Sequence, residues 1–404
     1  MEEILIRLKK NIALIVPVFP PYNNSAAIQL FDLAQEFKKQ GYKITVIVPS
    51  SEISSSYRFE TKDGIDILRL KTIKMTDVGN IRRAIAELLM PYFMIFNLRK
   101  SNINYIQWDG LIWYSPSIFF GPLIKFLKKH NNVRSYLIVR DIFPDWAVDL
   151  ELMKRGLIYQ FFKQVEKSQY KLADTIGVQT KGNLEYFDKI TQRHTNSLEV
   201  LHNWLSDTPI EKCSISLASS LLAKKKIAVY AGNMGVAQDL EFFLHLAKKM
   251  KSRKDFGFLF VGRGSQKKYL EKKAKHLNLS NVLFVDEINS SEMPGLFQQC
   301  HIGIVSLDKR HKQHNIPGKF LSYMSAGLPV LALVNKDNDL IDLVKKYDVG
   351  FASSNYSIKE IEILLVKILE KLILGKYQIN CKNLSSELFS PQLAVKKISR
   401  ALFK

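Results

Sequence analysis

The chain has 404 residues, which is longer than one ordinary hydrophobic core supports, so we expect two domains of similar size. An apolar fraction of 47% and a charged fraction of 24% indicate a soluble, well-packed protein. The formal net charge of +21 is the outlying value. It favours either a polyanionic partner or a lysine-rich surface that is simply solvated.

Several classes of protein are excluded by short features of the sequence. The three cysteines, Cys213, Cys300 and Cys381, have neither metal-ligand spacing nor the even number of a disulfide framework, which suits a reducing cytosol. The N-terminus begins with acidic residues and has no cleavage site, so it is not a secretory signal. The most apolar segment, residues 84–98, carries Glu87 and is too short to span a bilayer.

The first half of the chain alternates apolar runs with segments of helical period, which predicts a parallel sheet covered on both faces. The predicted strands are residues 11–17, 43–49, 105–108, 135–139, 175–178 and 198–202. The predicted helices are residues 26–40, the region near 116–130, and 156–171. Residues 58–71 predict a hairpin that turns at Asp63-Gly64.

Residues 207–226 are polar, serine-rich and lysine-ended, so we expect an interdomain linker there. A second alternating unit follows, with predicted strands at 227–231, 258–261, 282–285, 302–305 and 330–334, and helices at 239–251, 266–278, 291–300, 319–326, 339–347 and 357–375. The expected domains are therefore 1–206 and 207–390. Residues 391–404 are expected to form a C-terminal helix that can cross back to the first domain.

The most informative stretch is residues 311–334. Pro317-Gly318 breaks the chain, Lys319 opens a helix, and Gly327 ends that helix as a left-handed cap. A lysine in a first turn opposes the helix dipole. A bound anion reverses this penalty, because free backbone N–H groups and the ammonium can grip a phosphate together. The alternative is a solvated lysine at an ordinary loop-to-helix junction.

Two glycine-containing loops follow predicted strands in the same domain. They are Gly232-Asn233-Met234-Gly235 and Gly262-Arg263-Gly264. Glycine lets the backbone approach a ligand closely, and the helix that follows offers N–H donors to a phosphate. The guanidinium of Arg263 and the point charge of Lys319 together suit a diphosphate. The alternative is that tight strand-to-helix turns use glycine for their own packing.

Other polar residues have structural explanations beside the functional ones. Ser25 is expected to cap a helix rather than to contact a ligand. Arg140-Asp141 ends a buried strand with charge, which requires either a function or a partner, and pairing with neighbouring backbone is the alternative. In the Asp337-Asn338-Asp339 tripeptide the last residue stands at a helix N-cap, so we expect no metal there. The roles of His311 and His314 stay open, and His301 is expected to be structural.

These motifs resemble the family 4 retaining glycosyltransferases. Residues 317–330 carry the Pro-x-Lys-x-x-x-Tyr and Ala-Gly-x-Pro-Val pattern of one subgroup. Residues 139–163, with ADTIGVQT and YAGNMGVAQDLE, are similar to bacterial L-fucosamine (N-acetylfucosamine) transferases of O-antigen and capsule assembly. The resemblance implies an α/β GT-B fold, in which two Rossmann-like doubly wound domains face an interdomain cleft. It also implies a UDP-sugar donor, a lipid-linked glycan acceptor, no metal or other cofactor, and a cytoplasmic protein at the inner face of the membrane.

The resemblance also supplies the candidate site, with departures from the family pattern. Two glutamates that many members carry eight positions apart look like His314 and Ser322 here, and Arg140 stands where a histidine is often found. Ala237-Gln238 stand near the position of an expected lysine, so the usual Arg/Lys pair is missing. The predicted catalytic residues are Arg140, Asp141 and His314. The predicted donor-binding residues are Gly232, Asn233, Gly235, Gly262, Arg263, Gly264, Asp286, Pro317, Gly318, Lys319 and Ser322.

Two other functions stay open at this point. One is a nucleotide-sugar 2-epimerase, and the other is a non-enzymatic basic protein that binds a membrane or nucleic acid. Nucleic acid is not expected as a partner, because the chain lacks the aromatic-basic interleaving of a known nucleic-acid module. Residues 84–98 are bracketed by Arg82-Arg83 and Arg99-Lys100, which suits docking on an anionic inner leaflet. The alternative for that segment is a core helix broken at Pro91.

Overall fold

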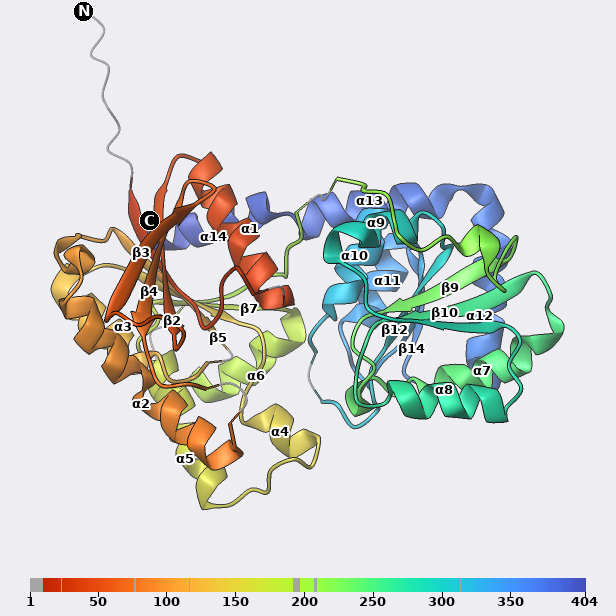
Figure 1. The fold of residues 1–404 in the computed structure, drawn as a ribbon, viewed down its shortest axis with the longest axis horizontal. Coiled ribbons are helices and arrows are strands. Elements are labelled where there is room, and N and C mark those ends of the chain that lie inside the picture. Colours follow the sequence, from red (N-terminus) through yellow and green to blue (C-terminus); the bar gives the residue numbers. More distant parts are fainter. Residues whose placement is uncertain are drawn as a thin grey trace, which may run out of the picture. The chain divides into compact units, whose positions relative to one another are not determined.

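The computed structural model describes residues 10–22, 24–75, 78–115, 117–191, 197–206, 209–312 and 314–404. The chain divides into two compact units (Figure 1). The first is Met1–His202 with Pro391–Lys404, and the second is Asn203–Ser390. Each unit is a mainly parallel sheet with helices on both faces, so the predicted doubly wound α/β fold is confirmed.

The sheet of the first unit has, among the described residues, eight strands in the order β3-β4-β2-β1-β5-β6-β7-β8. They are β1 (Asn11–Ile15), β2 (Lys43–Ser50), β3 (Tyr57–Lys62), β4 (Ile65–Lys71), β5 (Gly110–Ser115), β6 (Ser135–Val139), β7 (Thr175–Val178) and β8 (Ser197–Val200). The predicted hairpin is confirmed, since β3 and β4 pair antiparallel and the turn residues Asp63 and Gly64 have φ of 49° and 70°. The other neighbouring strands pair in parallel.

The strand predicted at residues 105–108 is wrong. Residues Asn102–Tyr105 form a 3-10 turn, and β5 begins at Gly110. The backbone N–H of Trp108 donates to the side chain of Asn131 at 2.8 Å, so this N–H is bound to a side chain and not to a neighbouring strand. The predicted strand and β5 therefore do not overlap.

The helices of the first unit follow the pattern of apolar residues. They are α1 (Ser25–Lys39), α2 (Asn80–Arg99), α3 (Gly121–Asn131), α4 (Asp145–Asp149), α5 (Leu157–Tyr170), α6 (Lys181–Thr191) and α14 (Pro391–Leu402). The predicted cap Ser25 is wrong, because the side chain of Asn24 accepts the hydrogen bond from Ala27 N at 2.9 Å. The break at Pro91 that belonged to the alternative for this segment is also absent, since α2 continues through Pro91 with Met90 and Met94 buried in the core.

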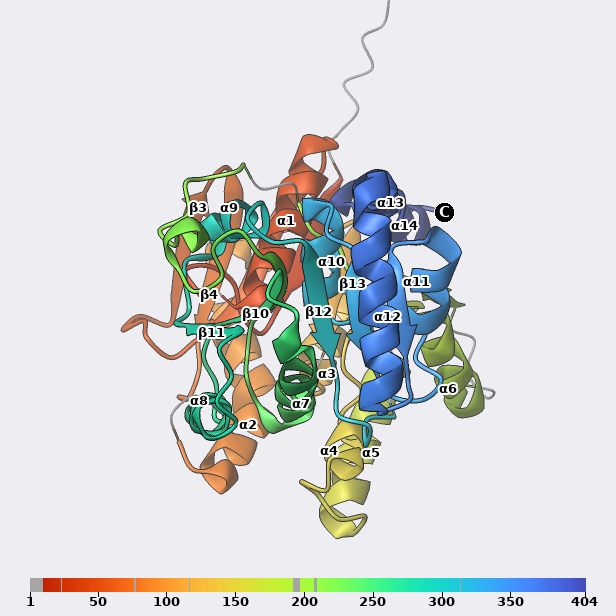
Figure 2. The same ribbon diagram turned by 90° about the vertical axis from the view of Figure 1, so that its right-hand side faces the viewer.

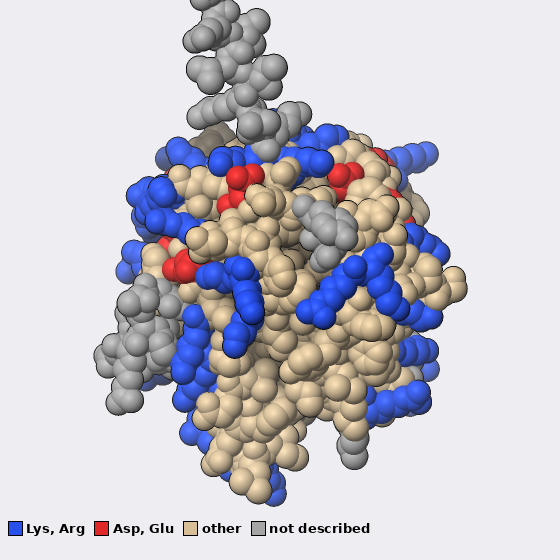
Figure 3. Space-filling model, turned by 90° about the vertical axis from the view of Figure 1, so that its left-hand side faces the viewer, with Lys and Arg blue, Asp and Glu red and all other residues tan. Residues whose placement is uncertain are grey.

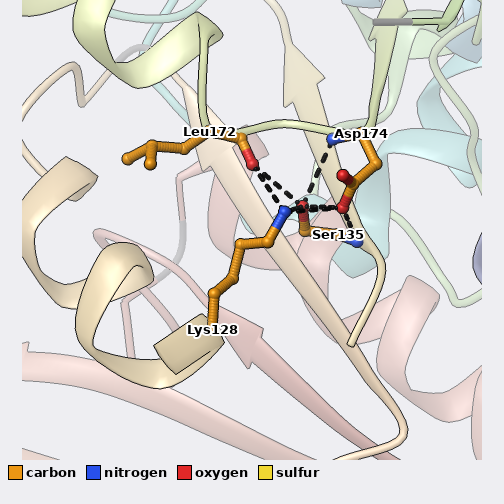
Figure 4. Close-up of polar contacts among 4 residues, drawn as sticks. All are labelled: Lys128, Ser135, Leu172 and Asp174. Atoms are coloured by element: carbon orange, nitrogen blue, oxygen red, sulfur yellow. Dashed lines mark hydrogen bonds and ion pairs between the residues drawn. The ribbon is translucent and has the colours of Figure 1, made fainter. Parts of the chain in front are cut away.

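A polar cluster fastens the first unit at the amino ends of β6 and β7 (Figure 4). The carboxylate of Asp174 accepts hydrogen bonds from Lys128 Nζ at 2.7 Å and from Ser135 N and Oγ at 2.8 and 2.7 Å. Lys128 Nζ also donates to Leu172 O at 3.0 Å. This lysine therefore ties α3 to the sheet and is more than a solvated surface charge.

Helix α14 returns to the first unit and packs on α1. Gln392 Nε2 donates to Glu36 Oε2 at 3.2 Å, and the ring of Phe403 stacks on Tyr42 with centroids 5.7 Å apart. A Cβ on Gly110 would lie 3.0 Å from Leu402 Cδ1. The last residues of the chain therefore complete the hydrophobic core of the unit that contains its beginning.

The sheet of the second unit has, within the described part of the chain, six parallel strands in the order β11-β10-β9-β12-β13-β14. They are β9 (Lys226–Ala231), β10 (Phe256–Val261), β11 (Val282–Val285), β12 (Ile302–Ser306), β13 (Val330–Leu333) and β14 (Gly350–Ser353). The helices are α7 (Glu241–Lys249), α8 (Lys267–His276), α9 (Met293–Phe297), α10 (Gly318–Ala326), α11 (Leu340–Tyr347), α12 (Ile358–Lys371) and α13 (Lys376–Leu388).

Two hydrophobic cores flank this second sheet (Figure 2). One contains residues of α9, α10, α11 and α13, and the other contains residues of α7, α8 and α12. The stretch predicted as a linker is packed onto this unit, since Leu217 and Leu222 are buried and Gln299 Nε2 donates to Ile215 O at 2.9 Å. The predicted helix after Pro317-Gly318 is confirmed, and Gly327 ends it with φ of 76°.

Candidate functional site

The strands β9 and β12 meet where the strand order of the second sheet reverses. They pair at Ala228 and Val229 with Ile302 and Gly303, while β9 runs on to Ala231. In doubly wound sheets, ligands bind outside the carboxyl ends of the strands at such a switch point. The functional site is therefore expected at the end of β9.

Tyr323 of α10 binds the end of β9 at this switch point. Its hydroxyl donates to Val229 O and accepts from Ala231 N, both at 3.1 Å. These two backbone groups lie on the side of β9 that faces β12, as does Ile227 O, which accepts from His301 N. The tyrosine hydroxyl thus replaces the ladder partners that β12 no longer supplies.

The loops after β9 and β10 are joined to each other. Met234 N donates to Arg263 O at 2.7 Å, and Gly262 and Gly264 have φ of 137° and 147°. A Cβ at Gly262 would lie 2.1 Å from Gly232 O, and one at Gly264 would lie 2.4 Å from Met234 O. These two glycines are therefore required by loop packing, which was the alternative explanation.

Lys319 lies beside the first of these loops. A Cβ on Gly232 would meet Lys319 Cε at 3.7 Å, and the ammonium lies 5.0 Å from the centroid of the Tyr230 ring. Helix α10 has no side-chain cap at Pro317, and a Cβ on Gly318 would meet nothing within 4 Å. The amino end of α10 therefore has no side-chain cap, and Lys319 stands in its first turn.

The ammonium of Lys319 makes no hydrogen bond or ion pair within the described residues, beyond its approach to Tyr230. Burial lowers its pKa from 10.5 to about 8. A half-buried cation at the positive end of a helix dipole is unfavourable by itself. An anion placed there would be attracted by the ammonium and by the free N–H groups of the first turn together.

The predicted donor residues outside α10 and its N-cap position lie in the loops that follow β9, β10 and β11. Arg263 is 81% exposed and its Nε lies 3.2 Å from Glu287 Oε2. Asn233 and Gly235 lie in the loop after β9, where Gly235 N donates to Gln238 Oε1 at 3.0 Å. Asp286 follows β11, two strands away, and its hydrogen bond from Lys267 lowers the pKa of its carboxyl.

His314 and Ser322 lie before and within α10. His314 Nδ1 is 2.7 Å from Asp337 O, and because a carbonyl only accepts, Nδ1 carries the proton and Nε2 is the acceptor of the neutral ring. Ser322 is half-buried, one turn after Lys319. The structure thus brings His314, Ser322 and Lys319 to one helix and the loop that leads into it.

The Asp337-Asn338-Asp339 tripeptide caps α11, but the side chain that accepts the hydrogen bond is that of Asn338 and not that of Asp339. Asp339 precedes the helix as predicted, but Asn338 Oδ1 accepts the hydrogen bond from Leu340 N at 3.0 Å. Asn338 is buried and is held in place by a 3.0 Å hydrogen bond to Asn335 Oδ1, and so its side chain reaches the helix end. The described residues contain no group of three His, Cys, Asp or Glu placed to hold a metal.

The predicted catalytic pair of the first unit lies at the carboxyl end of β6. Arg140 is buried, and its Nη1 donates to Leu201 O at 2.7 Å. Burial lowers its pKa, against the opposing effect of Tyr114. This is the backbone pairing considered as the alternative. Asp141 is exposed to solvent, and catalytic roles for both residues stay predictions.

A network of hydrogen bonds and ion pairs near α4 was not predicted from the sequence. Asp145 accepts hydrogen bonds from Tyr159 Oη at 2.8 Å, Lys163 Nζ at 2.6 Å and Tyr186 Oη. Lys163 also pairs with Glu166, which is fully buried. The one local signal was the spacing of Lys163 and Glu166 at i and i+3, which is common on helix surfaces.

Comparison with known proteins adds the family context. Residues 225–371 match the family model described as Glycosyl transferases group 1. The chain is 23% identical over 282 residues to the putative colanic acid biosynthesis glycosyl transferase WcaI of Escherichia coli (strain K12), covering 67% of each chain. It is 22% identical over 220 residues to the probable glycosyltransferase WbjE of Pseudomonas aeruginosa, covering 53% of this chain and 54% of that one.

Solved structures of similar fold cover nearly the whole chain. Sucrose-phosphate synthase from Thermosynechococcus elongatus has a TM-score of 0.75 at 14% identity, covering 98% of this chain and 99% of its own. WaaG, a glycosyltransferase involved in lipopolysaccharide biosynthesis, has a TM-score of 0.62 at 15% identity, covering 96% and 99%. Anabaena HepE in complex with UDP-glucose has a TM-score of 0.67 at 14% identity, covering 97% and 99%. Residues 225–371 therefore carry a glycosyl transferase group 1 domain, within a chain that has the two-domain GT-B fold.

Proposed function

We propose that this chain is a glycosyltransferase that moves a sugar from a nucleotide diphosphate, preferably UDP, to a lipid-linked oligosaccharide in the synthesis of a surface polysaccharide. The single observation that carries the proposal is the ammonium of Lys319, which has no hydrogen bond or ion pair among the described residues and stands at the uncapped amino end of α10. The family match over residues 225–371 supports the class of reaction. The names of the relatives, which concern colanic acid and lipopolysaccharide, support the class of product.

The diphosphate is proposed to sit at the end of α10. Lys319 would neutralise one phosphate and the N–H groups of the first turn would bind it, while the exposed Arg263 is free to swing from Glu287 toward the other. These groups favour the charge that develops on the leaving diphosphate in the transition state. UDP as the nucleotide is supported by the solved relatives with bound UDP or UDP-glucose.

The proposed transfer retains the configuration of the sugar. The bond from the anomeric carbon to the diphosphate oxygen breaks, and a bond to the acceptor hydroxyl forms on the same face. The proton of that hydroxyl passes to the departing phosphate, so the reaction requires no strong base from the protein. His314 Nε2, the acceptor nitrogen of its ring, would then orient a donor-sugar hydroxyl, and Ser322 would contact the ribose.

Roles in the first unit and the sugar itself complete the proposal. The exposed Asp141 is proposed to contact the acceptor, and the buried Arg140 to hold the loop that carries it. The sugar is proposed to be N-acetyl-L-fucosamine or a related amino sugar, on the basis of the resemblance in residues 139–163. No metal or other cofactor is proposed, so activity should survive EDTA. Loss of activity with EDTA, restored by Mg²⁺ or Mn²⁺, would contradict this.

The experiment is a thermal-shift screen across nucleotides and nucleotide sugars, followed by a transfer assay. A ligand that binds the native state raises the apparent Tm, so UDP and one UDP-sugar should raise it and GDP should not. Release of UDP should then require an acceptor. A protein whose Tm no nucleotide changes would contradict the proposal. Conversion of the donor to its 2-epimer without an acceptor would instead support an epimerase.

Arg263 offers a second test with a matched control. Arg263→Ala should lower turnover and leave Tm near that of the wild type, since its side chain is mostly exposed. Arg253 forms a comparable surface pair with Asp255, at 3.1 Å, so Arg253→Ala serves as the control and should leave turnover unchanged. If Arg263→Ala unfolds the protein, the residue is structural and its assignment to the diphosphate fails.

A further inference from the structure

Helix α2 has two apolar faces. One face lies in the core of the first unit, with Ala86, Met90, Met94 and Leu98 nearly inaccessible. The other face is exposed and runs the length of the helix at spacings of three and four residues. Its members are Ile85, Leu88, Leu89, Tyr92, Phe93 and Phe96, each 38% to 58% exposed. The helix is therefore neither an ordinary surface helix nor a core helix.

A second group of exposed apolar residues lies at the start of α5. Leu157, Ile158 and Phe161 are exposed, as is Leu152 in the preceding loop. In Figures 1 and 2 the amino ends of α2 and α5 both lie at the lower end of the first unit. In Figure 3 the lower half of the view is a broad tan area, in which few charged side chains lie. We call these residues of α2 and α5 the apolar surface, and a single flat partner can reach both parts of it.

Cations border the apolar surface. Arg82, Arg83, Arg99 and Lys100 are exposed at the two ends of α2, and Lys100 Nζ lies 4.1 Å from the centroid of the Phe96 ring. In Figure 3, blue side chains flank the tan area and red ones lie in the upper half of the view. The carboxylate within α2, Glu87, is paired with Arg83 at 2.8 Å.

The acidic residues near α5 lie at its margin. Asp149 and Glu151 precede Lys154 and Arg155, which stand immediately before the exposed residues of that helix. The net charge at the edges of the apolar surface is therefore positive. A second copy of the chain meeting it about a two-fold axis would bring these cations against each other. An anionic lipid bilayer offers an apolar interior and a negative surface at once.

We propose that the apolar surface of α2 and α5 docks the first unit on a bilayer that contains anionic lipid. The apolar side chains enter the boundary between headgroups and acyl chains, and the bordering arginines and lysines contact the lipid phosphates. None of the helices in the described parts of the chain is long and apolar enough to cross a bilayer, so the contact is at the surface. The inference rests on the proposed function only for its purpose, which is to meet a lipid-linked acceptor.

Flotation with vesicles of phosphatidylglycerol and phosphatidylcholine tests this proposal without donor or acceptor. The full chain should float with mixed vesicles at low salt and should bind pure phosphatidylcholine at least about tenfold more weakly, because each nearby cation adds to the attraction. Binding should also weaken as salt is raised. Absence of binding to the anionic vesicles at low salt would overturn the proposal, while nucleotide binding by the same preparation would leave the proposed function standing.

Three double variants locate the contact. Phe93→Ser with Phe96→Ser, and separately Leu157→Ser with Ile158→Ser, should each lower vesicle binding several-fold while the thermal melt stays cooperative. Ile373→Ser with Ile379→Ser changes exposed apolar residues of the second unit and should leave binding unchanged. If all three variants bind alike, the apolar surface is not the contact. If the first two instead convert a dimer to a monomer in solution, the surface joins two copies of the chain, and the proposal fails.

Discussion

The amino ends of α1 and α10 differ in how their free N–H groups are satisfied. In α1 the side chain of Asn24 accepts from Ala27 N, and the first turn has no basic residue. In α10 no side chain caps the helix at Pro317, and Lys319 stands in the first turn. A capped helix end needs no ligand. An uncapped end with a half-buried cation beside it is unfavourable until an anion binds, and for this reason we propose that α10 is the end that binds the donor.

The lysines Lys163 of the first unit and Lys319 of the second differ in the same way. Glu166 and Lys163 of the first unit are paired with each other, and Lys163 also pairs with Asp145. Lys319 of the second unit has no such partner in the described residues. A buried charge that is paired within the fold belongs to the structure. One left without a partner is a candidate for binding.

The largest expected effect concerns the residue that binds the end of β9 at the switch point. Tyr323→Phe should lower the free energy of unfolding by about 2–4 kcal/mol, because it leaves Val229 O and Ala231 N without the hydroxyl between them. Tyr136→Phe is the control in the first unit, where the hydroxyl donates to Glu199 at 2.8 Å, and it should cost about 1 kcal/mol. Urea unfolding measures both. Equal effects would mean that Tyr323 does not bridge the backbone.

The buried carboxylate of Glu166 should make stability depend on pH. Burial raises its pKa from 4.5 to about 6, against the opposing effect of Lys163. A raised folded-state pKa means that the fold favours the protonated carboxyl of Glu166. The stability that this protonated group contributes is fully present below pH 4.5 and is lost as the pH rises through 6. Wild type should therefore lose about 2 kcal/mol relative to Glu166→Gln between pH 4.5 and 7. Urea unfolding of both proteins at the two pH values is the measurement, and a constant difference between them would contradict the assignment.

A smaller effect is expected at the capped helix. Asn24→Ala should lower the free energy of unfolding by about 1 kcal/mol, since one N–H loses its acceptor. The affinity for UDP should not change, because this helix end is satisfied by the protein itself. Thermal unfolding and UDP calorimetry on the same variant separate the two effects. A variant that keeps its stability and loses UDP affinity would contradict the distinction between α1 and α10.

Local features were predictable from the sequence. The hairpin at Asp63-Gly64 and the helix from Gly318 to Gly327 depend on residues close together in the chain, and both were predicted with their turn or cap. The helices α13 and α6 were not predicted. In α13 the apolar stripe is weak, whereas α6 is as amphipathic as the predicted helix α3 and was missed. A turn or helix end is therefore predictable where the residues that determine it are neighbours in the sequence.

Contacts between distant residues were not predictable in this way. Tyr323 matched a motif, but its hydroxyl contacts residues 92 and 94 positions earlier. Asn131 accepts a hydrogen bond from Trp108 N across 23 positions, within the segment that was predicted as a strand. The glycines of the loop after β10 were predicted for a ligand and are explained by the neighbouring loop. Each of these depends on how strands and helices are brought together, which periodicity does not encode.

The central claim is that Lys319 binds the donor diphosphate, and calorimetry of UDP binding tests it most directly. Lys319→Met should weaken binding by about 1–3 kcal/mol at pH 7, the value of a charge-assisted hydrogen bond, and should raise the Tm of the unliganded protein. Because burial lowers the pKa of Lys319 to about 8, wild-type affinity should fall about tenfold from pH 7 to pH 9, while that of the variant stays level. Equal UDP affinity of the two proteins at both pH values would contradict the claim.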